Sequence, residues 1–315
     1  MLSHEIAVLF PGQGVLDTAA LRVYLAPTSE TLMMLREVDD ATQPLGRPSV
    51  MSALSSRRRD GVAFDLMIFA GSLAAYRRLE RQGVAPRALV GHGFGEIAAL
   101  VAAGALSIGA GAWIVARRAA VIASAKRRSA MAALKISPSN LKTFLGILNA
   151  EGVSVAAENS SMESVIVGPP AGIAAAEDMS RLFSIPFQRL KAVAGPHQSD
   201  MQEAKEALVR DLSGITVCTP QVPVYSPLRG RFYRHDDDVV ACIAEQLAQP
   251  LRFADAVDQL LASGVTLFVE CGPMRGLAAT LDCEAVADTS FAASPVGQIE
   301  DYDAADEGST SRKIA

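Results

Sequence analysis

Three closely spaced glycines at the end of a short apolar run constrain the fold of this chain more than any other feature of its sequence. The apolar run covers residues 88–90, the glycines are Gly91, Gly93 and Gly95, and a stretch of small residues follows over 97–104. Glycine permits sharp turns and close approach of neighbouring backbone. The segment therefore predicts a buried strand, a tight turn and a helix.

Strand and helix patterns alternate along most of the chain, which predicts an α/β fold. Residues 5–10 form a second apolar run that ends in Pro-Gly, as expected of a buried parallel strand. Residues 65–82 and 108–126 have the apolar spacing of helices. The alternation resumes after residue 200 and ends with another apolar run over 265–270.

The middle of the chain has a different order of elements. Its pattern predicts strand, helix, two strands, helix and strand over 131–136, 139–150, 153–158, 165–167, 172–183 and 187–193. This is the order of a ferredoxin-like fold. We therefore expect a large domain over 1–129 and 196–290, interrupted by a ferredoxin-like (α+β) subdomain over 130–195. The acidic residues 291–315 lack periodicity and predict a flexible tail.

The composition excludes several classes of function. The 315 residues are 50% hydrophobic and 20% charged, which suffices for a large core and excludes global disorder. A net charge of −5, from 29 basic and 34 acidic residues, argues against a nucleic-acid partner. We see no run long enough to span a membrane and no secretory signal. The four cysteines form no CxxC pair, so we expect reduced thiols in a cytoplasmic protein and no metal site. We expect no other cofactor.

The glycine-rich turn, which we call the elbow (residues 91–95), has the strand–turn–helix pattern on which serine hydrolases and acyltransferases carry their nucleophile. In that geometry the nucleophile stands at the sharpest point of the turn, here Gly93. Backbone N–H groups at the start of the following helix bind the oxyanion. Glycine has no side chain that attacks a substrate, so the elbow is present without its nucleophile.

Further motifs make the resemblance specific. Besides the elbow and its helix (91–104), they comprise residues 10–14 (Phe-Pro-Gly-Gln-Gly), 222–227 (Val-Pro-Val-Tyr-Ser-Pro), 245–253 and 269–273. With these motifs in order between residues 5 and 280, the chain resembles the malonyl-CoA:acyl carrier protein transacylase family, which includes the acyltransferase domains of fatty-acid and polyketide synthases. The resemblance implies an α/β-hydrolase-like domain with an inserted ferredoxin-like subdomain.

The resemblance also implies roles for individual residues. Gln13 and the backbone N–H of Phe94 match the oxyanion pocket, and Arg118 matches the arginine that grips the free carboxylate of a malonyl group. A plain charge on a helix surface is the alternative for Arg118. Gln246 matches the residue whose backbone carbonyl orients the histidine base. His92 follows the family pattern and is expected in the acyl-binding pocket, as a neighbour of the elbow rather than as a replacement base.

The histidine position departs from the family pattern as well. The family's segment, Val-Ser-x-Pro-x-His-Ser, reads Val-Ala-Gly-Pro-His-Gln-Ser over 193–199, so Gln198 matches the histidine and His197 lies one residue early. A neutral amide does not accept a proton from a nucleophile. Neighbouring side chains of an extended segment point in opposite directions, so His197 is a substitute base only if the local backbone shifts.

Three functional hypotheses follow from the two changed positions. The first, which we prefer, is a protein that binds an acyl-CoA or malonyl thioester, an acyl carrier protein or a polyketide synthase module without forming an acyl-enzyme. The second is an enzyme with a changed reaction on acyl or malonyl thioesters, such as hydrolysis, decarboxylation or cyclisation. The third is a malonyl-CoA:acyl carrier protein transacylase in which an engineered change has replaced serine by Gly93.

Overall fold

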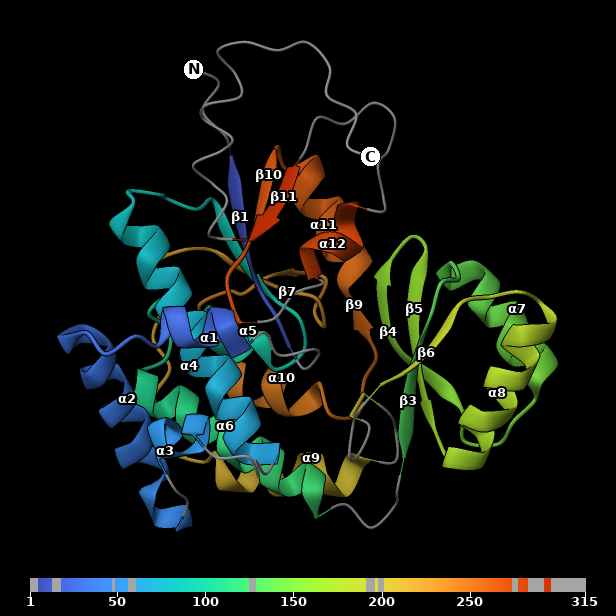
Figure 1. Cartoon of the computed structure of the whole chain (residues 1–315), viewed down its shortest axis with the longest axis horizontal. Coiled ribbons are helices and arrows are strands. Elements are labelled where there is room, and N and C mark those ends of the chain that lie inside the picture. The colour runs from blue at the N-terminus through green and yellow to red at the C-terminus, as the bar shows by residue number, and fades with distance from the viewer. Residues whose placement is uncertain are drawn as a thin grey trace.

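The computed structural model describes residues 5–12, 18–46, 49–55, 61–124, 129–190, 196–197, 201–273, 277–282 and 292–295. Their strands form two separate sheets with helices packed on them (Figure 1). This arrangement confirms the predicted α/β fold class.

The larger sheet has the strand order β11-β10-β1-β2-β7-β8. Its strands are β1 (Ile6–Phe10), β2 (Ala88–Gly91), β7 (Val224–Ser226), β8 (Arg231–Phe232), β10 (Leu267–Glu270) and β11 (Ala292–Pro295). All neighbouring pairs are parallel except β7 and β8, which are antiparallel. The central strands β1, β2 and β10 are buried almost throughout, which explains why their sequences are continuous apolar runs.

Helices cover both faces of the larger sheet. They are α1 (Thr18–Tyr24), α2 (Ser29–Thr42), the short 3₁₀ helix η1 (Gln43–Leu45), α3 (Val50–Ser55), α4 (Gly61–Arg81), α5 (Gly95–Ala102), α6 (Ile108–Ala123), α9 (Gln202–Asp211), α10 (Val239–Glu245), α11 (Phe253–Ala262) and α12 (Leu277–Asp282). Alternate side chains of β1 point to opposite faces of the sheet. Val8 and Phe10 pack in the core that includes α4, α5 and α6, whereas Ala7 and Leu9 pack with α11 and α12.

The smaller sheet has the order β6-β3-β5-β4-β9. Its strands are β3 (Ala130–Leu134), β4 (Ser154–Ser160), β5 (Glu163–Gly168), β6 (Phe187–Leu190) and β9 (Leu251–Arg252). The first four are antiparallel and alternate with α7 (Pro138–Leu148) and α8 (Pro170–Leu182), in ferredoxin-like order. Figure 1 shows α7 and α8 on the side of this sheet that faces away from the larger one.

Two details of the domain division differ from the expectation. Strand β9 lies outside residues 130–195 and pairs in parallel with β4. The smaller sheet therefore includes a strand from the later part of the chain. Residues 292–295, expected in a flexible tail, form β11 because their backbone pairs with the edge of β10. Residues 296–315 lie outside the described residues. The exact domain boundaries stay a prediction.

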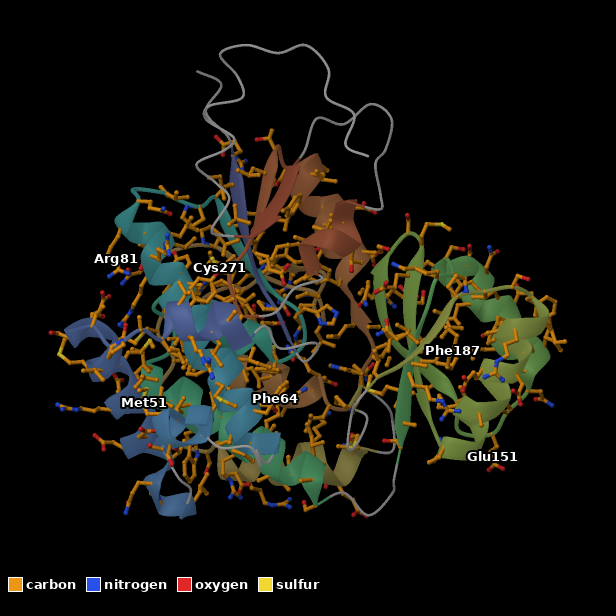
Figure 2. The ribbon with its side chains drawn as sticks, in the orientation of Figure 1. Met51, Phe64, Arg81, Glu151, Phe187 and Cys271 are labelled. Carbon is orange, nitrogen blue, oxygen red and sulfur yellow. The ribbon has the colours of Figure 1, made fainter. Side chains whose placement is uncertain are left out.

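Side chains separate into a continuous interior and a charged exterior. Cys271, at the end of β10, is fully buried, whereas Arg81 and Glu151 are exposed at distant parts of the surface (Figure 2). Within the described part of the chain, none of the helices combines the length and apolarity that a membrane span requires. The same residues contain no group of three His, Cys, Asp or Glu side chains arranged to hold a metal ion.

Candidate active site

Within the elbow, residues 92–94 form the turn between β2, which ends at Gly91, and α5, which begins at Gly95. Gly93 stands at its apex with a φ of +57°, in the left-handed region that favours glycine. The backbone N–H of Gly95 donates to the carbonyl of His92, and that of Glu96 donates to the carbonyl of Gly93, both at 3.1 Å. The predicted strand–turn–helix is therefore present.

The flanking glycines and Gly93 are required for different reasons. A Cβ atom on Gly91 would lie 2.0 Å from the backbone nitrogen of Glu96, and one on Gly95 would lie 2.2 Å from the carbonyl oxygen of Phe10. These two positions exclude any side chain. Among the described residues, a Cβ atom on Gly93 would meet ordinary contacts at 3.6 Å, to His197 Nε2 and Leu251 Cδ1. The space for a side chain at the apex is therefore available, and it lies beside an imidazole.

His197 faces this space because its backbone is not extended. Its φ is +69°, so the expectation of opposite side-chain directions along an extended segment does not apply to it. A serine Oγ lies about 1.4 Å from its Cβ, and a hydrogen bond of about 2.8 Å to a ring nitrogen places that nitrogen about 3.6 Å from Cβ. This is the separation at Gly93. Gln198 and Gln13, expected at the histidine position and in the oxyanion pocket, lie outside the described residues.

The hydrogen bonds of His197 define its tautomer. Its backbone N–H donates to the carbonyl of Leu247 at 2.8 Å, and Nδ1 lies 3.3 Å from the carbonyl oxygen of Gln249. A carbonyl only accepts, so Nδ1 carries the proton and Nε2 presents a lone pair towards Gly93. Burial lowers the pKa of His197 to about 3, and the positive charges of Arg118 and His92 act in the same direction. The imidazole is therefore neutral at physiological pH.

Gln246, the predicted orienting residue, has a side-chain contact that sequence analysis missed. Its backbone, like that of Gln249, raises the pKa of the His197 imidazole against the effect of burial. Its side chain is fully buried, and Nε2 donates to Glu96 Oε2 at 2.8 Å. Glu96 is also fully buried and accepts a hydrogen bond of 2.5 Å from the hydroxyl of Tyr233.

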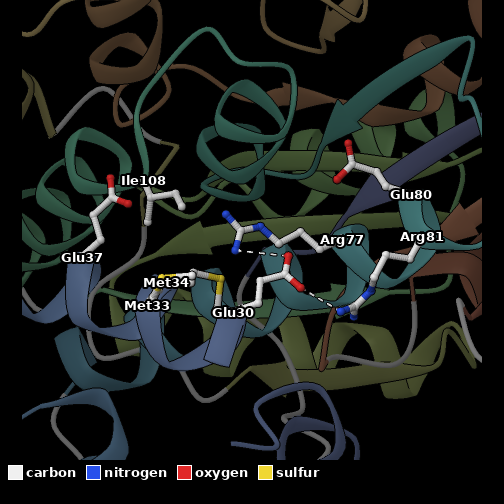
Figure 3. Close-up of a pocket in the computed structure, with 8 residues that line it drawn as sticks. All are labelled: Glu30, Met33, Met34, Glu37, Arg77, Glu80, Arg81 and Ile108. Carbon is white, nitrogen blue, oxygen red and sulfur yellow. Dashed lines mark hydrogen bonds and ion pairs between the residues drawn. The ribbon is translucent and has the colours of Figure 1, made fainter. Parts of the chain in front are cut away.

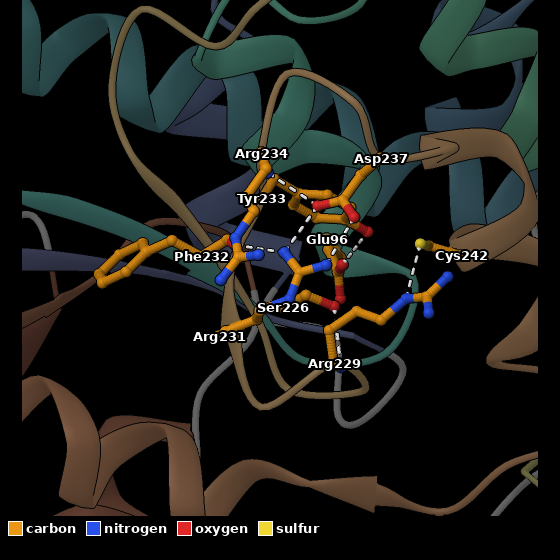
Figure 4. Close-up of polar contacts among 9 residues, drawn as sticks. All are labelled: Glu96, Ser226, Arg229, Arg231, Phe232, Tyr233, Arg234, Asp237 and Cys242. Carbon is orange, nitrogen blue, oxygen red and sulfur yellow. Dashed lines mark hydrogen bonds and ion pairs between the residues drawn. The ribbon is translucent and has the colours of Figure 1, made fainter.

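Figure 4 shows the polar cluster around Glu96, behind the elbow. Burial raises the pKa of Glu96 to about 7, while hydrogen bonds from Tyr233 and Ser226 and the charge of Arg229 oppose the shift. Arg229 in turn donates to Cys242 Sγ at 3.0 Å. A lone acidic residue at the start of an otherwise apolar helix was the available sequence signal for this site.

Arg118 projects from α6 into the interior, where it is only 2% exposed, so the alternative of a helix-surface charge is wrong. Its guanidinium lies 5.8 Å from the centre of the Phe94 ring, next to the elbow. Burial lowers its pKa to about 10 and the charge of Asp65 opposes this, so Arg118 remains a cation. Among the described residues its buried Nε has no hydrogen-bond partner. A buried cation with an unused donor is suited to an anionic ligand.

His92 joins the elbow to the smaller sheet. Its Nε2 lies 2.8 Å from Asn159 Oδ1, and Asn159 Nδ2 donates to Glu163 Oε1 at 3.0 Å. The second bond identifies Oδ1 as the acceptor, so His92 Nε2 is the donor. The ring also contacts the edge of Phe253 at 5.2 Å between centroids. Burial lowers the pKa of His92. These contacts agree with a neighbour of the elbow rather than a replacement base.

A surface cavity of about 450 Å³ lies elsewhere, between α2, α4 and the start of α6 (Figure 3). Two arginines of α4 meet Glu30 in its wall, Arg81 at 2.7 Å and Arg77 at 3.6 Å. Of the predicted site residues that the structure describes, none lines this cavity. It is therefore separate from the site at the elbow.

Comparison with known proteins identifies the class of this architecture. The family described as acyl transferase domain matches residues 49–293. The malonyl CoA-acyl carrier protein transacylase of Bacillus subtilis is 29% identical over 291 residues, 87% of this chain and 88% of that protein. Erythronolide synthase EryA3 of Saccharopolyspora erythraea is 30% identical over 298 residues, 90% of this chain but only 9% of the synthase.

Solved structures share the fold. FabD from Acinetobacter baumannii matches with a TM-score of 0.84 and 24% identity, over 95% of this chain and 97% of that one. The acyltransferase domain from module 8 of the salinomycin polyketide synthase matches with a TM-score of 0.82 and 24% identity, over 92% of this chain and 70% of that one. The large sheet with its inserted smaller sheet is thus a known arrangement.

Proposed function

This chain belongs to the acyl transferase domain family, and from that membership we propose that it binds acyl thioesters, or the proteins that carry them, without forming an acyl-enzyme. Acyl transfer through an enzyme intermediate needs a side-chain nucleophile at the elbow, which attacks the thioester carbonyl and expels the thiol. Gly93 has no such atom. This single observation carries the proposal.

The retained parts of the pocket support binding rather than a solely structural role. Arg118 is a buried cation beside the elbow and offers its guanidinium to the carboxylate of a malonyl group. The backbone N–H of Phe94, at the N-cap of α5, is available to a thioester carbonyl. The carrier would be coenzyme A, an acyl carrier protein or a polyketide synthase module, in line with the relatives' names.

Equilibrium titration tests this proposal. Malonyl-CoA should bind the chain saturably at one site, and chromatography after the titration should recover the thioester unchanged. Absence of saturable binding to malonyl-CoA, acetyl-CoA and their acyl-carrier-protein forms would contradict a binding role. Consumption of the thioester would contradict the absence of catalysis.

Hydrolysis is the second candidate, because His197 Nε2 presents a lone pair to the empty space beside Gly93. A water molecule in that space would attack the thioester carbonyl carbon and give its proton to Nε2; the carbon–sulfur bond would break and the thiolate would take up the proton. The products are a carboxylic acid and a free thiol. Thiol release from malonyl-CoA that disappears in His197→Gln would support this reaction, and no release over hours would exclude it.

A conventional transacylase whose serine has been replaced at Gly93 is the third candidate. A serine at Gly93 would lie at hydrogen-bond geometry to the neutral imidazole of His197, which supports this candidate. Full transfer to an acyl carrier protein by Gly93→Ser would support it. An acyl adduct on Gly93→Ser without onward transfer would favour the binding role.

A further inference from the structure

Glu96 lies three residues after Gly93 and has no part in the binding or chemistry proposed above. Its side chain is fully buried, and its backbone N–H donates to the carbonyl of Gly93 at 3.1 Å. An acid buried this completely costs free energy unless its contacts compensate. Its contacts therefore indicate what it does.

One of these contacts is with Gln246, the first residue of a turn over residues 246–249. This turn, which we call the turn that holds His197, contacts the backbone and the ring of His197. The carbonyl of Leu247 accepts the backbone N–H of His197 at 2.8 Å, and the carbonyl of Gln249 lies 3.3 Å from Nδ1. The backbone of Gln246 also acts on the same ring, whose pKa it raises. The orientation of the imidazole thus depends on the position of this turn.

Glu96 anchors the turn through the side chain of Gln246. Gln246 is the C-cap residue of α10, so the turn begins where the helix ends. Its Nε2 donates to Glu96 Oε2 at 2.8 Å, while its buried Oε1 has no hydrogen-bond partner in the part of the chain that the structure describes. The bond to Glu96 is therefore the contact that fixes this amide.

We propose that Glu96 is a positioning residue: it connects the apex of the elbow to the turn that holds His197 and so keeps the imidazole, as its Nδ1–H tautomer, directed at Gly93. The path runs from Gly93 through Glu96 and Gln246 to His197. This inference rests on the proposed function only in assigning His197 to the base position. The first test below needs no substrate.

The test is an NMR measurement of histidine tautomers in ¹⁵N-histidine-labelled protein. The chain has four histidines, and His197→Gln assigns the signal of His197. At pH 7.5 the wild-type His197 should show a protonated Nδ1 and an unprotonated Nε2. Glu96→Gln places an amide opposite two donors, the hydroxyl of Tyr233 and the side-chain amide of Gln246. Because this weakens the bond that anchors the turn, we expect the His197 signal to lose its single-tautomer signature. Gln246→Met, which breaks the same bond from the other side, should have the same effect.

Tyr233→Phe is the matched control. Tyr233 donates to the other oxygen of the same carboxylate, so its loss removes one bond to Glu96 and leaves the bond to Gln246. We expect lower stability but an unchanged His197 signal. A second readout places the variants in the Gly93→Ser background: Glu96→Gln should slow acylation about tenfold or more, and Tyr233→Phe less than about threefold.

The outcomes separate this inference from the proposed function. An unchanged His197 signature in Glu96→Gln and Gln246→Met would overturn the positioning role, as would equal changes in Tyr233→Phe. If Gly93→Ser forms no acyl-enzyme, the assignment of His197 as base fails, while the tautomer spectra still decide whether Glu96 positions the ring.

Discussion

At the scale of single residues, the site places a neutral imidazole beside a glycine at the apex of the elbow. The Nδ1 atom of His197 lies 3.3 Å from the carbonyl oxygen of Gln249, and its Nε2 would lie at hydrogen-bond geometry to a serine at Gly93. A pKa near 3 makes this imidazole a weak base. The proposed binding role therefore depends on Gly93.

Arg118 should determine whether the pocket distinguishes charged from uncharged acyl groups. Two charge-assisted hydrogen bonds to a carboxylate are lost in Arg118→Gln, so we expect malonyl-CoA to bind about tenfold to a hundredfold more weakly. Acetyl-CoA has no carboxylate and should bind equally well to both proteins. Calorimetric titration measures both affinities.

Arg117→Gln provides the control for this prediction. Arg117 is the adjacent residue of the same helix, and its Nε donates to Asp211 at 3.0 Å on the other side of α6. Its replacement should leave the affinity for malonyl-CoA unchanged. An equal loss in both variants would indicate a general charge effect and contradict carboxylate binding by Arg118.

Glu96 should make stability depend on pH in an unusual direction. Its pKa is raised from 4.5 to about 7, so its stabilising contribution is fully present below pH 4.5 and is lost as pH rises through 7. This loss amounts to about 3 kcal/mol. His197 acts oppositely, since its pKa is lowered from 6.5 to about 3 and its contribution is lost as pH falls below 6.5.

Comparison with Glu96→Gln isolates the Glu96 contribution. The variant has no proton to lose at this position, so its free energy of unfolding relative to wild type should rise by about 3 kcal/mol between pH 4.5 and 7. Urea unfolding at closely spaced pH values measures the difference. Parallel curves would show that Glu96 has an ordinary pKa in the folded protein.

At the scale of elements, the site depends on how closely α5 approaches β1. The start of α5 touches the carbonyl of Phe10, at the end of β1, and only glycine at position 95 leaves room for that contact. The elbow is thus a packing feature shared by a helix and two strands.

A methyl group at position 95 should disrupt the elbow. In Gly95→Ala the new Cβ would lie 2.2 Å from the Phe10 carbonyl oxygen, so backbone must move, and we expect a loss of about 3 kcal/mol or more of stability. Gly146→Ala, on the exposed face of α7 with nothing within 4 Å, should instead gain about 0.5–1 kcal/mol. Denaturant unfolding of both variants checks the contrast, and similar stabilities would contradict the packing argument.

Local sequence patterns predicted the elements of this site but not their contacts. Strand β2, the elbow and α5 are visible in a run of glycines and small residues because each depends on neighbouring residues. The direction of the His197 side chain depends on a single left-handed φ angle. The spacing of hydrophobic residues does not predict such an angle. The bond between Glu96 and Gln246 spans 150 positions, and the two-residue strand β9 exists only through its pairing with β4.

At the scale of the whole molecule, the two sheets meet at the elbow. Leu251 of β9 belongs to the smaller sheet and faces the space beside Gly93, and Asn159 of β4 binds His92. The site is therefore assembled from both sheets, although its expected chemistry belongs to the larger one. The fold of the acyl transferase family is present, with a glycine at the apex of the elbow.

Intact-mass measurement after incubation with malonyl-CoA tests this central claim most directly. The wild-type chain should keep its unmodified mass, whereas Gly93→Ser should gain one malonyl group, because its hydroxyl would lie at hydrogen-bond distance from His197. Gly93→Ser with His197→Gln should acylate far more slowly. A stable malonyl adduct on the wild-type chain would contradict the account.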